Sequence, residues 1–220
     1  MKLSELSDTK KKIVLASEQL FRQYGYEETS MRMLADACDM AVGNLCYHFP
    51  KKEDLVMFDH NVLMDAFLST LDESRGPADP LEGYVAAEYN FVLRIARDAE
   101  LLRMYREVIN VPGLRQDYYQ KHHEVLLRFF SAADFGLNER AFYTSSVAFC
   151  SLCYSIIEQY DGVHEDDLDA SIHKALEARF LFLGKDPAEL SGAIDRGMAI
   201  GREQFEQISN SELFYGLLQQ

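Results

Sequence analysis

Residues 42–48 carry side chains whose types and spacing suit contact with a nucleic acid. Leu45 and Phe49 lie four residues apart and are expected to face inward on one helix. The outward positions are then Val42, Asn44, Tyr47 and His48. They offer an apolar contact, an amide that can bond a base edge or a phosphate, and two polar aromatic tips for the sugar-phosphate backbone. Gly43 has no side chain, so this helix could approach a groove closely.

Two short helices and a tight turn must position this run. The first helix would begin at Thr29 or Ser30, whose hydroxyl can cap it, and would leave Arg32 outside. The turn falls at 38–40, Pro50 ends the second helix, and Lys52 opens the next amphipathic run. This order of elements is the layout of a helix-turn-helix DNA reader, and it predicts double-stranded DNA as a partner.

The same region contains an ordered set of glycine, aromatic and lysine positions. The set comprises Gly25-Tyr26, Thr29-Ser30-Met31-Arg32, Leu34-Ala35, Gly43-Asn44-Leu45, Tyr47-His48-Phe49-Pro50 and Lys52-Glu53-Asp54-Leu55. On these residues, positions 10–58 resemble the N-terminal signature of the TetR family of bacterial transcriptional regulators. The family commonly has Gly-Val-Ser at the turn, where this chain has Asp39-Met40-Ala41. Asp39 can adopt a left-handed conformation, whereas Ala41 gives up a hydroxyl that often caps the recognition helix or touches phosphate.

The resemblance implies a division of the chain and a set of functional residues. Residues 1–50 would form a DNA-binding domain, and residues 51–220 a ligand-binding and dimerisation domain. The expected DNA contacts are Thr29, Ser30, Arg32, Ala41, Val42, Gly43, Asn44, Tyr47, His48 and Lys52. The helices at about 138–161 and 165–183 would pair with a second subunit as a four-helix bundle, and a small-molecule effector would bind within the C-terminal helices.

The formal net charge of −14 argues at first against a nucleic-acid partner, but the charge is unevenly distributed. Residues 1–58 hold eight Lys/Arg and nine Asp/Glu, whereas residues 59–220 hold fourteen and twenty-seven. The acidity therefore belongs to the C-terminal part, which would be held away from the duplex. We expect modest nonspecific DNA binding and a strong need for dimerisation.

Hydrophobic periodicity predicts an all-α protein of about nine or ten helices. Helices are expected over 9–24, 81–97, 99–111, 138–160, 168–183 and 187–208, with a longer one ending near 133. Gly25 would end the first as a left-handed cap residue, Asn138 would cap another, and Gly76-Pro77 makes the clearest break. No stretch of about eighteen apolar residues occurs, and the N-terminus lacks the apolar middle of a signal peptide. We expect a cytoplasmic protein without a membrane partner.

Aromatic residues are spread over the helices that would line the effector pocket. A tyrosine combines a flat apolar face with a hydroxyl that can orient a ligand, although most such residues are expected to be ordinary core. The candidate pocket residues are Tyr84, Tyr89, Tyr105, Arg106, Tyr119, His122, Phe149 and Tyr154. Charged residues of the same helices, including Glu88 and Glu107, could form charge pairs in the pocket but are expected mainly on solvated faces.

Cys150 and Cys153 form a CxxC pair that invites a metal or thiol function, with His122 and His123 as further candidate ligands. Zinc needs about four ligands, and no second strong cluster is found. The apolar neighbours of the pair indicate a buried helix, in which cysteine packs as a small hydrophobe, so no metal site is predicted. A thiol- or metal-responsive regulator that uses this pair remains the alternative function.

Motifs of catalysis are not found. The sequence has no glycine-rich phosphate loop, no nucleophile elbow and no HExxH, so neither an enzyme activity nor a cofactor is predicted. The leading prediction is a homodimeric repressor that a small-molecule effector releases from an approximately palindromic operator. A helical ligand-binding or enzymatic body with a vestigial DNA module is a further alternative.

Overall fold

The computed structural model of the chain describes residues 6–73 and 79–210. Over these residues it contains ten α-helices, one 3-10 helix and no strand, which confirms the all-α prediction. The elements are α1 (Asp8–Tyr24), α2 (Met31–Ala37), α3 (Val42–His48), α4 (Lys52–Glu73), α5 (Pro80–Ala96), α6 (Ala99–Val108), α7 (Pro112–Phe129), η2 (Ala132–Phe135), α8 (Glu139–Gln159), α9 (Glu165–Phe182) and α10 (Pro187–Asn210). The helix expected to end near 133 stops at Phe129, and η2 follows it. The predicted break at Gly76-Pro77 lies outside the described residues.

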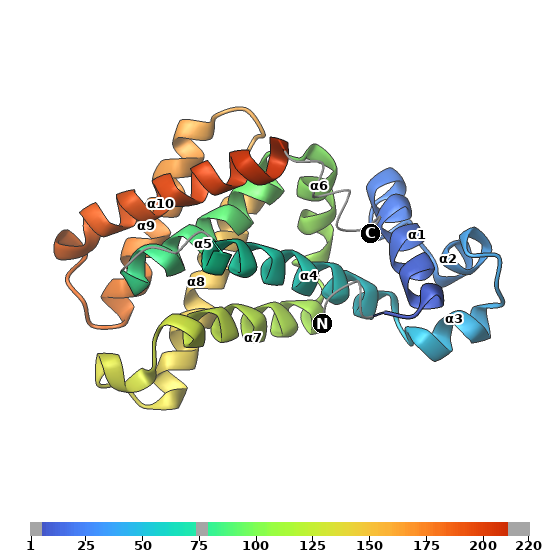
Figure 1. Cartoon of the computed structure of the whole chain (residues 1–220), viewed down its shortest axis with the longest axis horizontal. Helices are drawn as coiled ribbons and strands as arrows, with labels where there is room; N and C mark the ends of the chain where they lie inside the picture. Colours follow the sequence, from blue (N-terminus) through green and yellow to red (C-terminus); the bar gives the residue numbers. More distant parts are fainter. Residues whose placement is uncertain (1–5, 74–78, 211–220) are drawn as a thin grey trace.

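Two groups of helices are joined by α4 (Figure 1). Helices α1, α2 and α3 lie together at one end, and α4 runs from them into the larger body formed by α5–α10. Helix α6 contacts α1 and is the part of the body that lies next to the small group. None of the described helices combines the length and apolarity that crossing a bilayer requires.

Side-chain caps explain where several helices begin. Ser7, Ser30 and Asn138 stand in extended conformation before α1, α2 and α8, and each accepts a hydrogen bond from a backbone N–H of the first turn. Asp79 and Asp98 do the same before α5 and α6. These bonds satisfy N–H groups that no helical carbonyl can reach. The predicted caps at Ser30 and Asn138 are thereby confirmed.

Gly25 ends α1 and lets α6 come close. Its φ of +88° is one that residues with a side chain rarely adopt. Its ψ of 170° differs from that of the predicted left-handed cap, so the chain leaves α1 in a more extended direction. A Cβ atom at this position would lie 2.7 Å from Glu107 Oε1 on α6. The backbone conformation therefore favours glycine, and a larger residue would also displace the Glu107 carboxylate.

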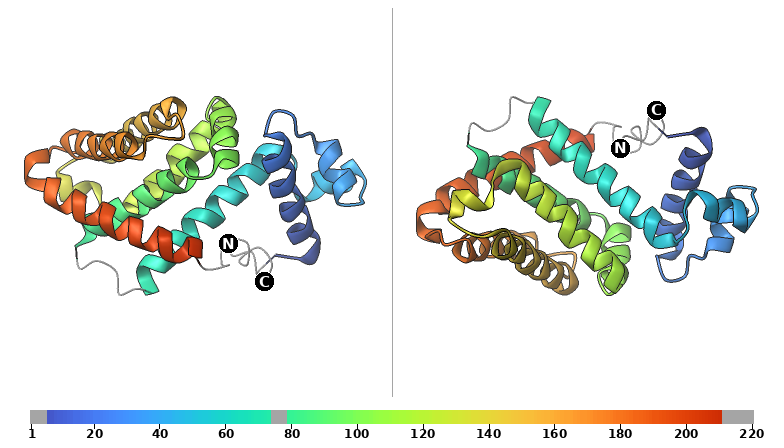
Figure 2. Two further views of the ribbon diagram at one scale, coloured as in Figure 1. Left: turned by 90° about the horizontal axis from the view of Figure 1, so that it is seen from above. Right: turned by 90° about the horizontal axis from the view of Figure 1, so that it is seen from below.

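Helix α5 is the centre of the larger body. Almost all of its residues are buried, because α4, α6, α7, α8 and α10 pack around it. Figures 1 and 2 show α10 lying across it. A Cβ atom at Gly197 of α10 would stand 2.6 Å from that of Val85, and one at Gly201 would stand 2.9 Å from the Ala86 carbonyl oxygen. The two helices are therefore in backbone contact over one turn.

Candidate DNA-binding face and internal polar cluster

Helix α3 separates an inward row of side chains from an outward row, as its sequence predicts. Leu45 is fully buried, and Phe49, directly after the helix, is also buried. The exposed residues are Val42, Gly43, Asn44 and Tyr47. Tyr47 is 82% exposed, and the half-buried His48 lies edge-on to it with ring centroids 5.2 Å apart. A short exposed helix of this kind can enter a major groove.

The turn before α3 is built around Asp39, whose φ is +51°. Aspartate tolerates this conformation better than most residues with a side chain, so the turn forms without glycine. The Met40 N–H donates to the Ala35 carbonyl oxygen at 3.0 Å and closes the turn. Ala41 stands in extended conformation before α3 and supplies no side-chain cap, as expected for a methyl group.

Two residues predicted to face DNA point inward instead. Thr29 is 1% exposed, and its hydroxyl donates to the Gly25 carbonyl oxygen at 2.7 Å. The Lys52 ammonium donates to three backbone carbonyl oxygens, those of Tyr26, Glu27 and Thr29. These bonds use all three of its donors, and burial lowers the Lys52 pKa. In this structure Lys52 therefore holds α4 to the corner between α1 and α2, and its ammonium group does not point outward as the predicted phosphate contact would require.

The other predicted contacts before α3 remain at the surface. Ser30, Arg32 and Ala41 are exposed, and the Ser30 hydroxyl oxygen accepts the Met33 N–H at 3.2 Å. Lys10 of α1 comes 5.8 Å from the ring centroid of Phe49 and brings a cation close to the end of α3.

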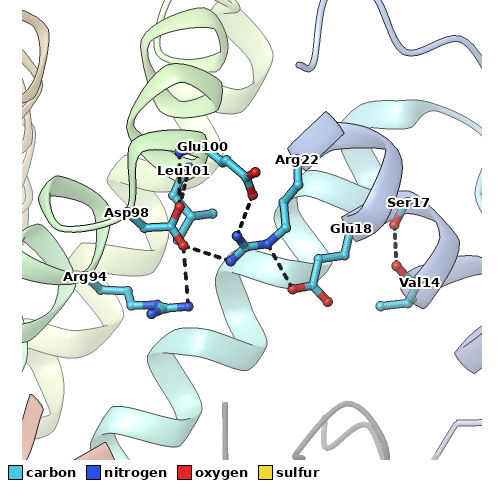
Figure 3. A network of polar contacts seen from close by, with 8 residues as sticks. All are labelled: Val14, Ser17, Glu18, Arg22, Arg94, Asp98, Glu100 and Leu101. Atoms are coloured by element: carbon cyan, nitrogen blue, oxygen red, sulfur yellow. Dashed lines mark hydrogen bonds and ion pairs between the residues drawn. The ribbon is translucent and has the colours of Figure 1, made fainter. Parts of the chain in front are cut away.

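Helix α6 holds the small group through a network of ion pairs (Figure 3). Arg22 at the end of α1 donates to Asp98 Oδ2 at 2.9 Å and to Glu100 Oε2 at 2.8 Å. Glu18, one turn earlier, lies 3.5 Å from Arg22 Nε. Asp98 is also the N-cap of α6, so one carboxylate both starts this helix and binds α1. Burial raises the Asp98 pKa, but the Leu101 N–H and the Arg22 charge outweigh burial, and the net pKa is lowered.

The C-terminal half of α6 meets the corner between α1 and α2. Glu107 Oε2 accepts the backbone N–H of Glu27 at 2.9 Å, beside Gly25. Arg103, one turn earlier, donates to the Arg22 carbonyl oxygen. Glu107 was expected mainly on a solvated face; it is half-buried, and its carboxylate is bonded to the small group. Successive turns of α6 thus contact α1 and the residues that follow it.

The opposite face of α6 reaches a buried polar cluster. The Tyr105 hydroxyl lies 3.0 Å from His60 Nδ1 on α4. His122 Nδ1 of α7 lies 2.8 Å from Glu88 Oε2 of α5, and the His60 and His122 ring centroids are 5.7 Å apart. All four residues are buried, so Glu88 does not lie on a solvated face and instead forms an internal pair, which was the alternative prediction. Burial lowers the His60 pKa well below its usual value, which keeps this ring neutral near pH 7.

Three further predicted pocket residues approach this cluster. The ring centroids of Tyr154 on α8 and Tyr118 are 6.1 Å apart. Tyr119 stacks on Tyr154 with ring centroids 6.0 Å apart. Tyr84 lies one turn before Glu88 on α5 and is fully buried. The structure therefore brings Tyr84, Tyr105, Tyr119, His122 and Tyr154 to one region where α4, α5, α6, α7 and α8 meet.

The remaining predicted pocket residues lie elsewhere. The Tyr89 hydroxyl donates to Asp169 of α9 at 2.7 Å, next to α10. Arg106 donates to the carbonyl oxygen of Tyr160, where α6 meets the end of α8. Phe149 is buried beneath a guanidinium group rather than beside the histidines. Tyr89 and Arg106 thus serve contacts between helices away from the cluster, whereas Phe149 reaches only the guanidinium that also lies over Tyr84.

That guanidinium belongs to Arg179 of α9, which sequence reasoning missed. Arg179 is 1% exposed and lies 5.1 Å from the Tyr84 ring centroid and 4.7 Å from that of Phe149. Its Nη2 donates to Ser146 at 3.1 Å, but Nε and Nη1 are buried without a hydrogen-bond partner. The apolar residues around Arg179 in the sequence were the available signal that its helix face is buried.

Comparisons with known proteins agree with the geometry of the small group. A family model described as "Bacterial regulatory proteins, tetR family" matches residues 13–57, which include α2 and α3. This segment of the chain therefore matches the TetR family of regulators. The HTH-type transcriptional regulator TcmR of Streptomyces glaucescens is 27% identical over 129 residues, which are 55% of this chain and 57% of TcmR. The chain thus spans just over half the length of this relative.

Solved structures extend the likeness over most of the chain. RolR in complex with resorcinol aligns with a TM-score of 0.58 at 16% identity, covering 86% of this chain and 93% of RolR. Thermus thermophilus FadR in complex with lauroyl-CoA aligns with a TM-score of 0.55 at 19% identity, covering 80% and 92%. These structures show that the larger body also has the fold of TetR-family proteins.

The CxxC pair lies in the core of the larger body. Cys150 and Cys153 are 1% and 5% exposed, and burial raises the pKa of both thiols. A protonated buried thiol is a poor nucleophile and a poor metal ligand. In the part of the chain that the structure describes, no three potential ligands gather around a common point. The thiol- or metal-responsive alternative therefore gains no support.

Helices α8 and α9 leave an apolar groove along their outer side. The groove is lined by Leu152, Ile156, Asp167, Ala170, Ser171, Lys174, Ala175 and Ala178. Leu152 is 42% exposed, and Leu181 and Phe182 at the end of α9 are 62% and 51% exposed. Large apolar side chains gathered along one face indicate a surface for association rather than a solvated one.

Proposed function

We propose that this TetR-family protein is a homodimeric transcriptional repressor that acts on DNA in the cytoplasm and is released by a small-molecule effector. The observation that carries the proposal is the division of α3 into a buried row and an exposed row. Leu45 and Phe49 fix the helix to the small group, while Asn44 and Tyr47 stand outside. A recognition helix needs this arrangement, because its outer side chains must reach base edges and phosphates.

The proposed DNA-binding domain comprises residues 1–50, and residues 51–220 form the ligand-binding and dimerisation domain. The contacts proposed with DNA are Ser30, Arg32, Ala41, Val42, Gly43, Asn44, Tyr47 and His48. Thr29 and Lys52 act differently, since their polar groups hold the frame of the domain. Asn44 suits base reading, whereas Tyr47 suits the backbone of the duplex.

Dimerisation is proposed through α8 and α9. Their outer groove exposes apolar residues that a second copy would cover, and two copies of a helix pair form a four-helix bundle. A two-fold dimer presents two α3 helices to successive major grooves, which are about 34 Å apart along the duplex. Doubling the contacts would also offset repulsion between the acidic body and DNA.

The effector site is proposed at the buried polar cluster. RolR is solved with resorcinol and FadR with lauroyl-CoA, so proteins of this fold take small molecules. In this chain the cluster contains His60 of α4 and Tyr105 of α6, the two helices that hold the small group. A ligand that favours one arrangement of these helices would change the spacing of the DNA-reading helices. The ligand can shift the equilibrium between the DNA-binding and the released arrangement only by the difference between its affinities for the two.

Selection of bound sequences from a random duplex library tests the proposal. The wild-type protein should enrich an approximately palindromic site, and sedimentation should show a dimer on and off DNA. Asn44→Ala should change the enriched bases, whereas Tyr47→Ala should weaken all sites similarly. A monomer that enriches no sequence would refute the proposal.

A further inference from the structure

We propose that the effector site accepts an uncharged, planar aromatic molecule whose hydroxyl group donates a hydrogen bond to Glu88. The inference rests on the proposed function, because it assigns a ligand chemistry to the effector site of that regulator. Three observations carry it: an unpartnered carboxylate oxygen, the aromatic rings around it, and a buried positive charge nearby.

Glu88 supplies the polar anchor. One carboxylate oxygen, Oε2, lies 2.8 Å from His122 Nδ1, whereas Oε1 is buried and has no hydrogen-bond partner. Such atoms are uncommon in folded proteins, since their hydrogen bonds to water have been lost without replacement. A carboxylate oxygen accepts hydrogen bonds, so an O–H or N–H group is the partner that Oε1 lacks. A ligand with a hydrogen-bond donor could therefore satisfy Glu88 Oε1.

Three further polar atoms of the same region are buried without a hydrogen-bond partner. They are the hydroxyl oxygens of Tyr84 and Tyr154 and the Nε2 of His60. Tyr84 lies one turn from Glu88 on the same face of α5, and the rings of Tyr118 and His122 connect Tyr154 and Glu88 to His60. Hydroxyl and neutral imidazole groups can each donate or accept, so a ligand with more than one hydroxyl would satisfy several of them.

The surroundings of these atoms favour a flat ring. Phe91 stands edge-on to both His60 and His122, with ring centroids 5.0 and 4.9 Å apart. Tyr105 and Tyr118 lie nearly parallel, with an interplanar angle of 20° and centroids 5.8 Å apart. Aromatic walls pack well against another ring in an edge-on or offset arrangement. An aliphatic ligand would make fewer favourable contacts with these aromatic side chains.

The positive charge of Arg179 disfavours a cationic ligand. Its buried guanidinium has no carboxylate within ion-pair distance among the residues that the structure describes. Arg179 and Glu88 both influence Tyr84, Cys150 and Cys153 electrostatically, so the two charges share one buried region. A cation brought to Glu88 would therefore face Arg179 in a medium of low dielectric. A neutral phenol donates to Glu88 without this repulsion.

The enclosed position of these atoms links binding to the DNA-reading helices. A ligand can reach Glu88 Oε1 only if neighbouring side chains and helices move apart, since the atom is fully buried. His60 and Tyr105, which bond across the site, belong to α4 and α6. Opening the site would therefore displace one or both of the helices that hold the small group.

Isothermal titration calorimetry of the full-length protein tests the inference. The probes are resorcinol, 1,3-dihydroxynaphthalene and quercetin, each beside its fully O-methylated counterpart, with benzyltrimethylammonium as a cationic aromatic. At least one phenol should bind, and its methyl ether should bind at least about tenfold more weakly. Glu88→Gln should weaken the phenol by about tenfold or more and reduce its advantage over the ether. Glu124→Gln, a change at an exposed carboxylate of α7, should leave binding unchanged.

A second variant keeps the test decisive if Glu88→Gln does not fold. Tyr154→Phe retains the ring and removes an unpartnered hydroxyl, and it should also weaken the phenol more than the ether. The ligand class is refuted if no phenol binds, if ethers bind equally well, or if benzyltrimethylammonium binds most tightly. Sequence selection with the same preparations separates the two proposals. Failure of phenol binding with intact operator binding overturns the ligand class alone, whereas loss of operator binding by the wild-type protein overturns the proposed function.

Discussion

The ion pair between Arg22 and Asp98 offers a quantitative test of how α6 holds the small group. Arg22 is 14% exposed at its side chain and Asp98 18%, so this pair is neither a solvated surface pair nor a fully buried one. Surface pairs contribute about 0–1 kcal/mol, and breaking a buried pair costs about 3–5 kcal/mol. Arg94 lies 3.9 Å from the same Asp98 oxygen and would partly compensate it. We therefore expect Arg22→Ala to lower the free energy of unfolding by about 1–2 kcal/mol.

A double-mutant cycle isolates the pair. Asp98→Asn removes the charge but keeps an oxygen that can accept the N–H groups of Glu100 and Leu101, since asparagine is a good N-cap. Urea unfolding of the two single variants and the double variant, at one protein concentration, should give a coupling energy of about 1 kcal/mol. Arg140→Ala, at an exposed arginine of α8, should change stability by less than about 0.5 kcal/mol.

The pH dependence of this coupling follows from the lowered Asp98 pKa. A carboxylate whose pKa is depressed on folding contributes stability that is present above its unfolded value, here 3.8, and is lost as the pH falls through the folded value. The coupling should therefore persist at neutral pH and decline only below 3.8. A coupling energy indistinguishable from zero at neutral pH would show that this ion pair does not hold α6 to the small group.

Three further results are expected. Tyr47→Ala should weaken operator binding by roughly tenfold without lowering the melting temperature, whereas Tyr24→Ala, at another exposed tyrosine, should leave gel-shift affinity unchanged. Lys52→Ala should lower the free energy of unfolding by about 1–3 kcal/mol yet keep the salt dependence of operator binding, while loss of a phosphate contact would reduce that slope by about 0.9. Cys150 and Cys153 should react with iodoacetamide only after unfolding, as mass spectrometry can show; rapid labelling of the native protein would contradict their burial.

Local patterns in the sequence were sufficient for the helices and for the orientation of α3. Ser30 and Asn138 mark helix starts because a cap acts on N–H groups only two or three residues away. Leu45 and Phe49 identify the inward side of α3 because side chains four apart share a helix face. Asp39 could be placed in a turn because its tolerance of positive φ is a property of the residue itself.

Contacts between distant residues were beyond such patterns. Lys52 looks like a surface cation, but the carbonyl oxygens that it binds lie 23–26 residues earlier in the chain. Glu88 pairs with a histidine 34 residues away, and no periodicity within α5 specifies that partner. Glu88 does carry a local signal, since apolar residues precede and follow it at helical spacing. A lone carboxylate on an otherwise apolar face should be read as buried and in need of a partner.

The glycines of α10 limit which parts of the body can transmit a signal. Val85 and the Ala86 carbonyl group leave no room for side chains at positions 197 and 201, so displacing α10 along α5 by one residue would drive Met198 or Arg202 into the α5 main chain. The relative position of α5 and α10 is therefore fixed, and we expect the two helices to move together as one rigid unit. A ligand that binds inside the body would therefore have to move α4 or α6, the helices that hold the small group, rather than α5 and α10.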